Sequence, residues 1–214
     1  DQFDYIIIDE SHRSAANMYQ NVLNYFRPKF LLGMTATPER MDGADIFKLF
    51  GYNVAYEIRL QKALEEEMLC PFHYFGISDI ALDGMPEDND FDFNQLASNE
   101  RVDKIIEKSN KYGCYDGVLR GLIFCSRAEE ARQLSDKLCE RGLRVISLTG
   151  QNTEEEREEG IRRIEKDPND PSKLDYIITV DIFNEGVDIP SLNQIIMLRP
   201  TQSAIIFVQQ MGRG

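Results

Sequence analysis

The chain of 214 residues has 37 acidic and 24 basic side chains and a net charge of −13, which argues against binding nucleic acid through overall charge alone. Hydrophobic residues make up 42%, as in an ordinary globular protein, and no apolar run approaches the roughly 20 residues that a membrane helix needs. The four cysteines lack Cys-x-x-Cys spacing and there are only two histidines, so we expect reduced thiols in a cytoplasmic protein rather than disulfides or a zinc site.

Apolar runs alternate with helical periodicities over the first third of the chain. The pattern predicts, in chain order, strand 5–8, helix 15–26, strand 30–34, helix 45–50, strand 54–60, helix 61–68 and an extended segment 72–77. Residues 79–92 contain Gly84, Pro86 and many acids, which predicts a loop.

A regular alternation of helices and strands begins after residue 100. The pattern predicts helix 101–111, strand 121–125, helix 129–141, strand 143–148, helix 154–166, strands 176–180 and 194–198, and helix 203–211. These strands are continuous apolar runs, which indicates a parallel α/β sheet covered by helices on both faces. We place a domain boundary near residue 70, where Cys70-Pro71 interrupts a helical pattern.

The first chemical motif is the acid pair Asp9 and Glu10, directly after the first apolar strand. Ligands bind at the carboxyl ends of strands in α/β sheets. There Asp9 is placed to hold Mg²⁺, directly or through water, and Glu10 to orient or deprotonate a water beside a γ-phosphate. Taken alone, the pair is better explained as the N-cap of the following helix.

Two further polar motifs also follow predicted strands. Thr35 and Thr37 stand on either side of an alanine, where their hydroxyls can bond an acid or a histidine on the neighbouring strand. Ser126 and Arg127 end a buried strand at the start of a helix, where a hydroxyl suits a phosphate. Alone, the threonines are ordinary at the end of a strand, and Ser126 is ordinary as an N-cap.

The last two motifs are more specific. Residues 185–190 read Glu-Gly-x-Asp-x-Pro, in which Gly186 permits a sharp turn and a purely structural turn would not need both acids. Residues 209–214 read Gln-Gln-Met-Gly-Arg-Gly, in which Arg213 is a candidate arginine finger for a γ-phosphate. The alternative for Arg213 is a bond to carbonyls at a helix C-terminus.

The order of these motifs resembles the superfamily II helicases and translocases of the Asp-Glu-x-His branch, over essentially all 214 residues. Five segments resemble the family's motifs in order: residues 9–12 resemble motif II, 35–37 motif III, 122–127 motif IV, 179–190 motif V and 209–214 motif VI. Residues 30–40 and 56–75 look most like bacterial restriction-type (Res subunit) helicases, especially those fused to a phospholipase-D-like nuclease module.

The resemblance implies a P-loop NTPase-type α/β fold, with two RecA-like lobes, ATP between them and nucleic acid across both. Residues 1–70 would form the C-terminal part of lobe one, and residues 71–214 a nearly complete lobe two. The implied cofactors are ATP and Mg²⁺, with Asp9 as the metal ligand. The implied site residues are catalytic Asp9, Glu10, His12 and Arg213; nucleotide-facing Gly186, Asp188, Gln209 and Arg213; coupling Thr35 and Thr37; and, nearer the nucleic acid, Ser126, Arg127, Thr149, Gly150 and Thr179.

Two parts of the family pattern are missing from the 214 residues. No Gly-x-x-x-x-Gly-Lys-[Ser/Thr] loop is present, and the family's second motif VI arginine would lie two positions beyond Gly214. We therefore expect a piece cut at both borders of the ATP site, which alone neither binds ATP tightly nor hydrolyses it. We also expect residues 1–70 to pack poorly, or to associate non-natively through the open edge of strand 30–34.

Three functions are compatible with this pattern. The favoured one is an ATP-dependent DNA helicase or translocase. The second is a nucleic-acid-binding or regulatory module with a vestigial ATP site, which the retained Asp9, Glu10 and Arg213 disfavour. The third is a motor on duplex DNA without strand separation, like the chromatin remodellers. The restriction-type stretch favours DNA over RNA, and RNA stays open as a partner together with a fused or associated nuclease module; no membrane partner is expected.

Overall fold

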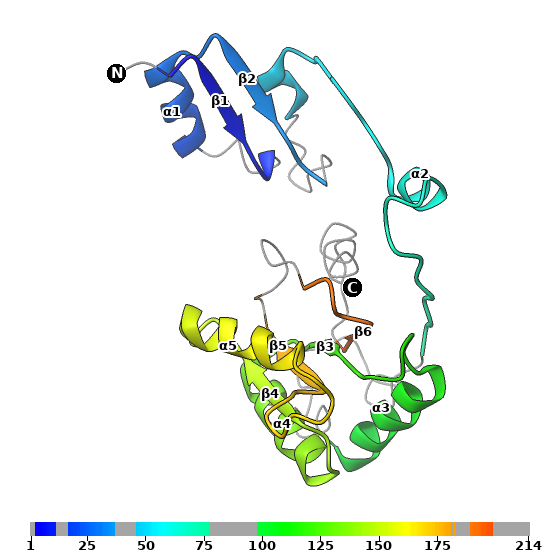
Figure 1. Ribbon diagram of the computed structural model, residues 1–214. Coiled ribbons are helices and arrows are strands. Elements are labelled where there is room, and N and C mark those ends of the chain that lie inside the picture. Colours follow the sequence, from blue (N-terminus) through cyan, green and yellow to red (C-terminus); the bar gives the residue numbers. More distant parts are fainter. Residues whose placement is uncertain are drawn as a thin grey trace, which may run out of the picture. The chain divides into compact units, whose positions relative to one another are not determined.

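The structure is a computed structural model that describes residues 3–11, 17–36, 46–77, 98–180, 182 and 189–198. The chain divides into two compact units, Asp1–Pro71 and Phe72–Gly214 (Figure 1). Each unit is described by itself. No helix in these described ranges is long and apolar enough to cross a membrane.

The first unit is built on a parallel pair of strands. Strand β1 (Tyr5–Ile8) pairs with β2 (Phe30–Gly33), and helix α1 (Asn17–Phe26) connects them. A parallel pair needs such a crossover, because a tight hairpin would reverse the chain direction. A 3₁₀ turn, η2 (Phe47–Phe50), and a short helix, α2 (Leu60–Glu65), follow.

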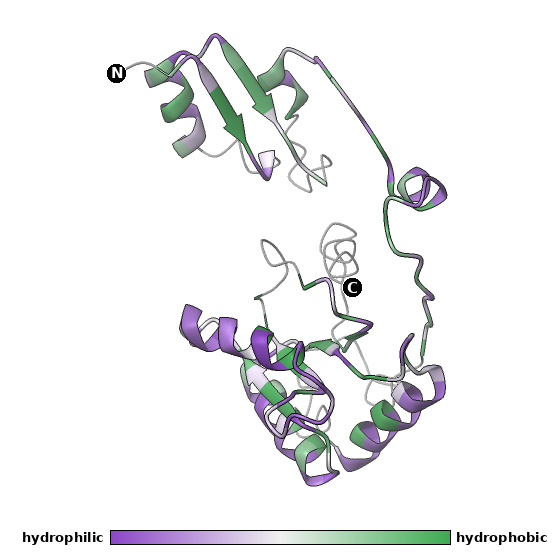
Figure 2. Cartoon of the chain, in the orientation of Figure 1, coloured by the Kyte–Doolittle hydropathy of each residue, from purple (hydrophilic) through white to green (hydrophobic). Residues whose placement is uncertain are grey.

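Little of the first unit is buried. Ile8, Ile46 and Ala63 are its buried hydrophobic residues in the described part. Hydrophobic residues are frequent along β1 and α1 (Figure 2), and several of their large side chains are exposed. The exposed large side chains of these two elements are Tyr5, Ile7, Met18, Val22 and Tyr25. The described part of this unit therefore buries little apolar surface.

Two predicted elements of this unit differ from the structure. Residues 54–60 form no strand, and no strand among the described residues pairs with this segment before α2 begins. An alternating pattern forms a strand only where another strand supplies hydrogen-bond partners, so this prediction was wrong. Residues 47–50 form a 3₁₀ turn rather than an α-helix. The predicted loop at 79–92 and helix at 203–211 lie outside the described residues.

The second unit contains a four-stranded sheet. Its elements are α3 (Asn99–Tyr112), β3 (Gly121–Phe124), α4 (Ala128–Glu140), β4 (Val145–Leu148), α5 (Glu154–Ile164), β5 (Tyr176–Thr179) and β6 (Gln194–Met197). The strand order is β4-β5-β3-β6, and all three pairings are parallel. The carboxyl ends of the strands therefore meet at one edge of the sheet.

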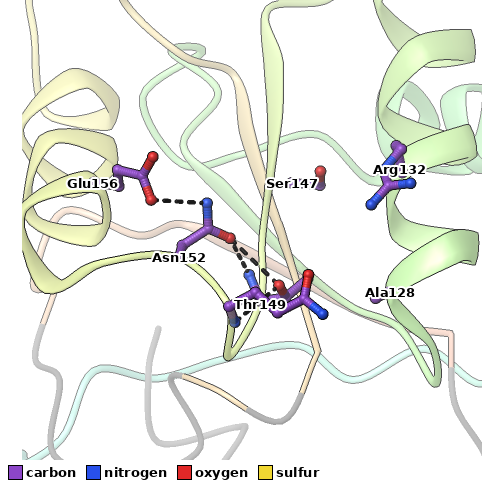
Figure 3. A pocket seen from close by; sticks show the side chains of 7 residues that line it. Ala128, Arg132, Ser147, Thr149, Asn152 and Glu156 are labelled. Carbon is purple, nitrogen blue, oxygen red and sulfur yellow. Dashed lines mark hydrogen bonds between the residues drawn. The ribbon is translucent and has the colours of Figure 1, made fainter.

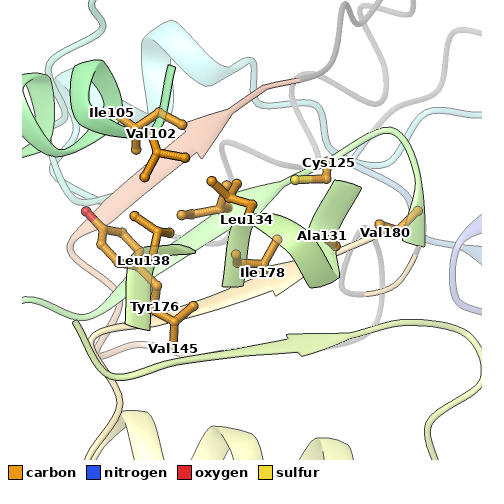
Figure 4. Packing of buried hydrophobic residues seen from close by; sticks show 11 residues of the cluster. Val102, Ile105, Cys125, Ala131, Leu134, Leu138, Val145, Tyr176, Ile178 and Val180 are labelled. Carbon is orange, nitrogen blue, oxygen red and sulfur yellow. The ribbon is translucent and has the colours of Figure 1, made fainter. Parts of the chain in front are cut away.

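Helices cover both faces of this sheet. On one face, α3 and α4 pack against β3, β4 and β5 through one hydrophobic cluster (Figure 4). Its labelled members are Val102, Ile105, Cys125, Ala131, Leu134, Leu138, Val145, Tyr176, Ile178 and Val180. On the other face, Ile164 of α5 packs with Leu122, Phe124 and Ile177. The predicted parallel α/β fold is confirmed.

Candidate nucleotide and nucleic-acid site

The acid pair lies in the turn that leaves β1. The backbone N–H of Glu10 donates to Asp9 Oδ1 at 2.9 Å, and Glu10 has a φ of 49°. Ser11 is buried, and its N–H donates to the carbonyl oxygen of Met34 at 2.9 Å. A left-handed conformation costs a non-glycine residue about 1–3 kcal/mol and occurs preferentially at functional sites. The turn thus holds an exposed Asp9 and a half-buried Glu10 at the strand end.

Thr35, a predicted coupling residue, lies at the same edge as the acids. It follows β2, and the N–H of Met34 donates to the carbonyl oxygen of Ile8 at 2.9 Å, which extends the parallel pairing beyond the strands. The structure therefore brings Asp9, Glu10 and Thr35 to one sheet edge. The predicted His12 and Thr37 lie outside the described residues.

In the second unit, the turn after β3 presents two predicted nucleic-acid residues. Ser126 and Arg127 are both exposed, and Arg127 occupies the N-cap of α4 without a side-chain cap bond. The alternative role of Ser126 as a plain N-cap is therefore wrong. The N–H of Ser126 instead donates to Glu130 Oε2 at 2.9 Å. Burial, and next the charge of Glu130, raise the pKa of the Cys125 thiol well above its usual range.

The turn after β4 presents the other predicted pair, Thr149 and Gly150. Asn152 Oδ1 accepts a hydrogen bond from the N–H of Thr149 at 2.8 Å. Arg157 Nη2 donates to the carbonyl oxygens of Thr149 and Gly150 at 3.4 and 3.2 Å. Thr153 and Glu156 form a capping box at the start of α5. These bonds fix the turn at the carboxyl edge of the sheet.

A polar cavity of about 350 Å³ opens between this turn and α4 (Figure 3). The lining residues are Ala128, Arg132, Ser147, Thr149, Gln151, Asn152 and Glu156. The cavity wall is charged at two points. Hydrogen bonds from Thr153 and Asn152 lower the pKa of Glu156, so it is an anion facing the cation Arg132. Hydroxyl, amide and guanidinium donors of this kind bind phosphate and sugar without reading sequence.

The sequence did not single out Arg132 or Ser147. Ser147 interrupts the apolar run of β4 just before the strand ends, which was an available signal. Arg132 lies more than one turn into α4, with an exposed side chain 3.3 Å from Glu129, and has the pattern of an ordinary surface residue. Only the fold shows that these two residues share a cavity with Thr149.

Thr179 also lies at the carboxyl edge of the sheet in the second unit, but its side chain is buried, unlike those of Ser126 and Arg127. Its side chain is fully buried, and its hydroxyl donates to the carbonyl oxygen of Ile182 at 3.0 Å. Thr179 therefore fixes the chain after β5 rather than presenting a hydroxyl to solvent. The predicted nucleotide-facing Gly186, Asp188, Gln209 and Arg213 lie outside the described residues.

Comparison with known families decides the class. Residues 98–214 match the model described as the helicase conserved C-terminal domain, which is more than half of the chain. The chain belongs to this helicase family. Residues 1–40 match the res subunit of type III restriction enzymes. Together the two matches confirm the predicted restriction-type helicase of superfamily II, and with it the RecA-like fold class.

Individual relatives are similar over nearly the whole chain at low identity. A 51.5 kDa protein of a Lactococcus phage is 22% identical over 98% of this chain, and an endonuclease subunit of the type I restriction enzyme EcoAI of Escherichia coli is 23% identical over all of it. The chain spans 45% and 30% of those two proteins. A solved fragment described as an HsdR subunit of a type I restriction enzyme from Vibrio vulnificus YJ016 matches 99% of this chain and 40% of that fragment, with a TM-score of 0.68 and 22% identity. That likeness supports the fold.

Proposed function

We propose that the protein couples ATP hydrolysis to movement along DNA. In this proposal residues 1–70 belong to RecA-like lobe one and residues 71–214 form lobe two. The supporting observation is geometric: every predicted site residue that the structure describes lies at the carboxyl edge of one of the two parallel sheets. That edge is where α/β folds bind ligands, and scattered surface positions would not support a common site.

Lobe one would supply the metal and water half of the ATP site. Mg²⁺ takes oxygen ligands and keeps several waters, so one exposed carboxylate, that of Asp9, fits as its protein ligand. Glu10 would orient the attacking water and accept its proton. The strained φ of Glu10 fixes where its side chain leaves the backbone. Thr35, with His12 and Thr37, would link this site to the nucleic acid.

Lobe two would hold the phosphate backbone of DNA through the turns after β3 and β4. Ser126, Arg127, Thr149 and Gly150 line that edge, and the cavity beside Thr149 adds Arg132. Contacts to phosphates give little sequence specificity, as a translocating motor requires. The assigned nucleotide contacts of this lobe are Gly186, Asp188, Gln209 and Arg213.

DNA is the proposed polynucleotide because the chain resembles restriction-enzyme subunits at both the sequence and the fold level. The lobe-two edge presents two exposed cations, Arg127 and Arg132, on an acidic chain. Binding should therefore depend on a few phosphate contacts and not on net charge.

The 214 residues alone should be inactive, because they include no phosphate-binding loop motif. The test compares ATP hydrolysis by this chain and by the full-length protein, with single-stranded DNA, duplex DNA and RNA. We expect hydrolysis by the full-length protein, stimulated more by DNA than by RNA, and none by the chain alone. Stimulation by RNA and not DNA would overturn the choice of DNA. Turnover by the 214 residues near the full-length rate would overturn the claim of inactivity.

A further inference from the structure

Two charged side chains are buried together beside the turn after β3. Arg101 of α3 and Glu130 of α4 form an ion pair with 2.9 Å between Nη1 and Oε1, and both side chains are 2% exposed. Removing two charges from water carries a large desolvation penalty, and an apolar pair of similar volume is often as stable. Stability alone is therefore a weak reason for this pair, and its other hydrogen bonds indicate another role.

The remaining atoms of the pair bind backbone at two strand ends. Glu130 Oε2 accepts from the N–H of Ser126 at 2.9 Å, and Arg101 Nη2 donates to the carbonyl oxygen of Leu198 at 3.1 Å. Ser126 follows β3 and Leu198 follows β6, and these two strands are neighbours. A backbone hydrogen bond from Leu198 to Phe124, 2.9 Å long, joins the same two ends. The ion pair thus connects the carboxyl ends of two adjacent strands through hydrogen bonds.

These two strand ends have different proposed tasks. In the proposed function, Ser126 and Arg127 contact DNA, whereas the chain after Leu198 leads in sequence to Gln209 and Arg213, which are assigned to ATP. We propose that Arg101 and Glu130 are a positioning pair that links the DNA contact after β3 to the nucleotide-facing segment after β6. This inference rests on the proposed function. A shift of Ser126 on DNA binding would move Glu130 through their hydrogen bond. Glu130 would move Arg101 through the ion pair, and Arg101 would move the carbonyl group of Leu198.

A second buried cation in the same unit provides a matched control. Lys173 is 1% exposed, and its Nζ donates to the carbonyl oxygens of Leu119 and Leu174 at 2.5 and 2.9 Å and to Asp175 Oδ1 at 3.2 Å. All these partners precede β3 or β5, so Lys173 lies at the amino edge of the sheet, opposite the candidate site. Its removal should affect stability without affecting coupling.

The experiment uses two variants of the full-length protein. One carries both Arg101→Met and Glu130→Leu, and the other carries Lys173→Met alone. ATP hydrolysis is measured with and without single-stranded DNA, together with the KM for ATP, the DNA concentration for half-maximal stimulation, and Tm. Because the double variant leaves no buried charge unpaired, we expect a Tm near that of the wild type. We expect basal hydrolysis to be retained and the DNA stimulation to fall about tenfold, since both backbone bonds are lost.

Lys173→Met should show the opposite result, a lower Tm with normal DNA stimulation. Arg101→Lys is a second variant in case the double variant does not fold. It keeps the charge of the pair and loses the bond to Leu198, so its stimulation should fall with little change in Tm. Stimulation within twofold of the wild type in the variants of the pair that fold would overturn the inference. A wild-type protein that DNA does not stimulate would instead overturn the proposed function.

Discussion

Arg144 and Asp175 join the amino ends of two neighbouring strands. Arg144 Nη2 lies 2.8 Å from Asp175 Oδ1, and Asp175 Oδ2 accepts from both the backbone N–H and Nε of Arg144, at 2.8 and 3.2 Å. The two residues directly precede β4 and β5. This three-bond contact fixes the β4–β5 register at the edge opposite the candidate site.

The contact makes the stability of the second unit depend on pH. Burial acts to raise the pKa of Asp175, but hydrogen bonds from Arg144 and Lys173 outweigh it and leave the pKa below its ordinary value of 3.8. The resulting stabilisation is present above pH 3.8 and is lost as the pH falls through the lower pKa of the folded state.

We therefore expect Asp175→Asn to lower the free energy of unfolding by about 1–3 kcal/mol at pH 7. The difference from the wild type should shrink as the pH falls below 3.8. Urea unfolding from pH 7 to pH 3 measures both effects, with the exposed Asp136→Asn as the control. A difference that stays constant over this range would contradict the assigned role of Asp175.

A second prediction concerns the contact between β3 and β5. A Cβ atom at Gly121 would lie 2.2 Å from Tyr176 Cδ1, and the Tyr176 ring is buried, with its hydroxyl bonded to Ser109 and Gln194. The ring cannot move without losing those bonds. Gly121→Ala should therefore lower the free energy of unfolding by about 1–3 kcal/mol.

The control for this substitution is Gly76→Ala, because a Cβ built at Gly76 has no atom within 4 Å among the described residues other than its chain neighbours. Hydrogen exchange of the β5 amides reports local stability in the second unit. Equal protection in the two variants would mean that the β3–β5 packing adapts to the added methyl group.

The polar cavity gives a third prediction. If Arg132 contacts a DNA phosphate, Arg132→Ala should weaken binding to all sequences alike. It should also reduce the slope of log affinity against log salt by about 1. Fluorescence anisotropy with the full-length protein, from 50 to 200 mM salt, measures both quantities.

Arg162→Ala is the matched control, since Arg162 is an exposed arginine in the last turn of α5 and does not line the cavity. Its removal changes the net charge equally and should leave the salt slope unchanged. Equal slopes for the two variants would indicate that the cavity lies outside the path of the DNA.

Apolar runs were sufficient to find the strands of the second unit, because strands buried on both faces are continuous in hydrophobicity. Every predicted strand from residue 121 onward is present, with ends that differ by one or two residues. The prediction of a strand at residues 54–60 was wrong because this alternating segment has no strand to pair with in the described part of the chain.

The buried pair Arg101 and Glu130 could not be predicted in the same way. Both residues fall in amphipathic helical patterns where a charge ordinarily marks the solvent face. They are 29 positions apart, and only the packing of α3 beside α4 shows that they meet. The motif residues were easier to find, because polar groups that end apolar strands are conspicuous in sequence.

In the proposed mechanism Glu10 acts on the water that attacks ATP, and the Glu10→Gln variant of the full-length protein probes this role. Asp4→Asn is the matched control, because Asp4 precedes the same strand at its other end and pairs with Lys29 at 2.9 Å. We predict that Glu10→Gln lowers DNA-stimulated ATP hydrolysis about 100-fold or more, with the KM for ATP little changed and Asp4→Asn near the wild-type rate. A Glu10→Gln variant that hydrolyses ATP within twofold of the wild-type rate would show that Glu10 does not act on the attacking water.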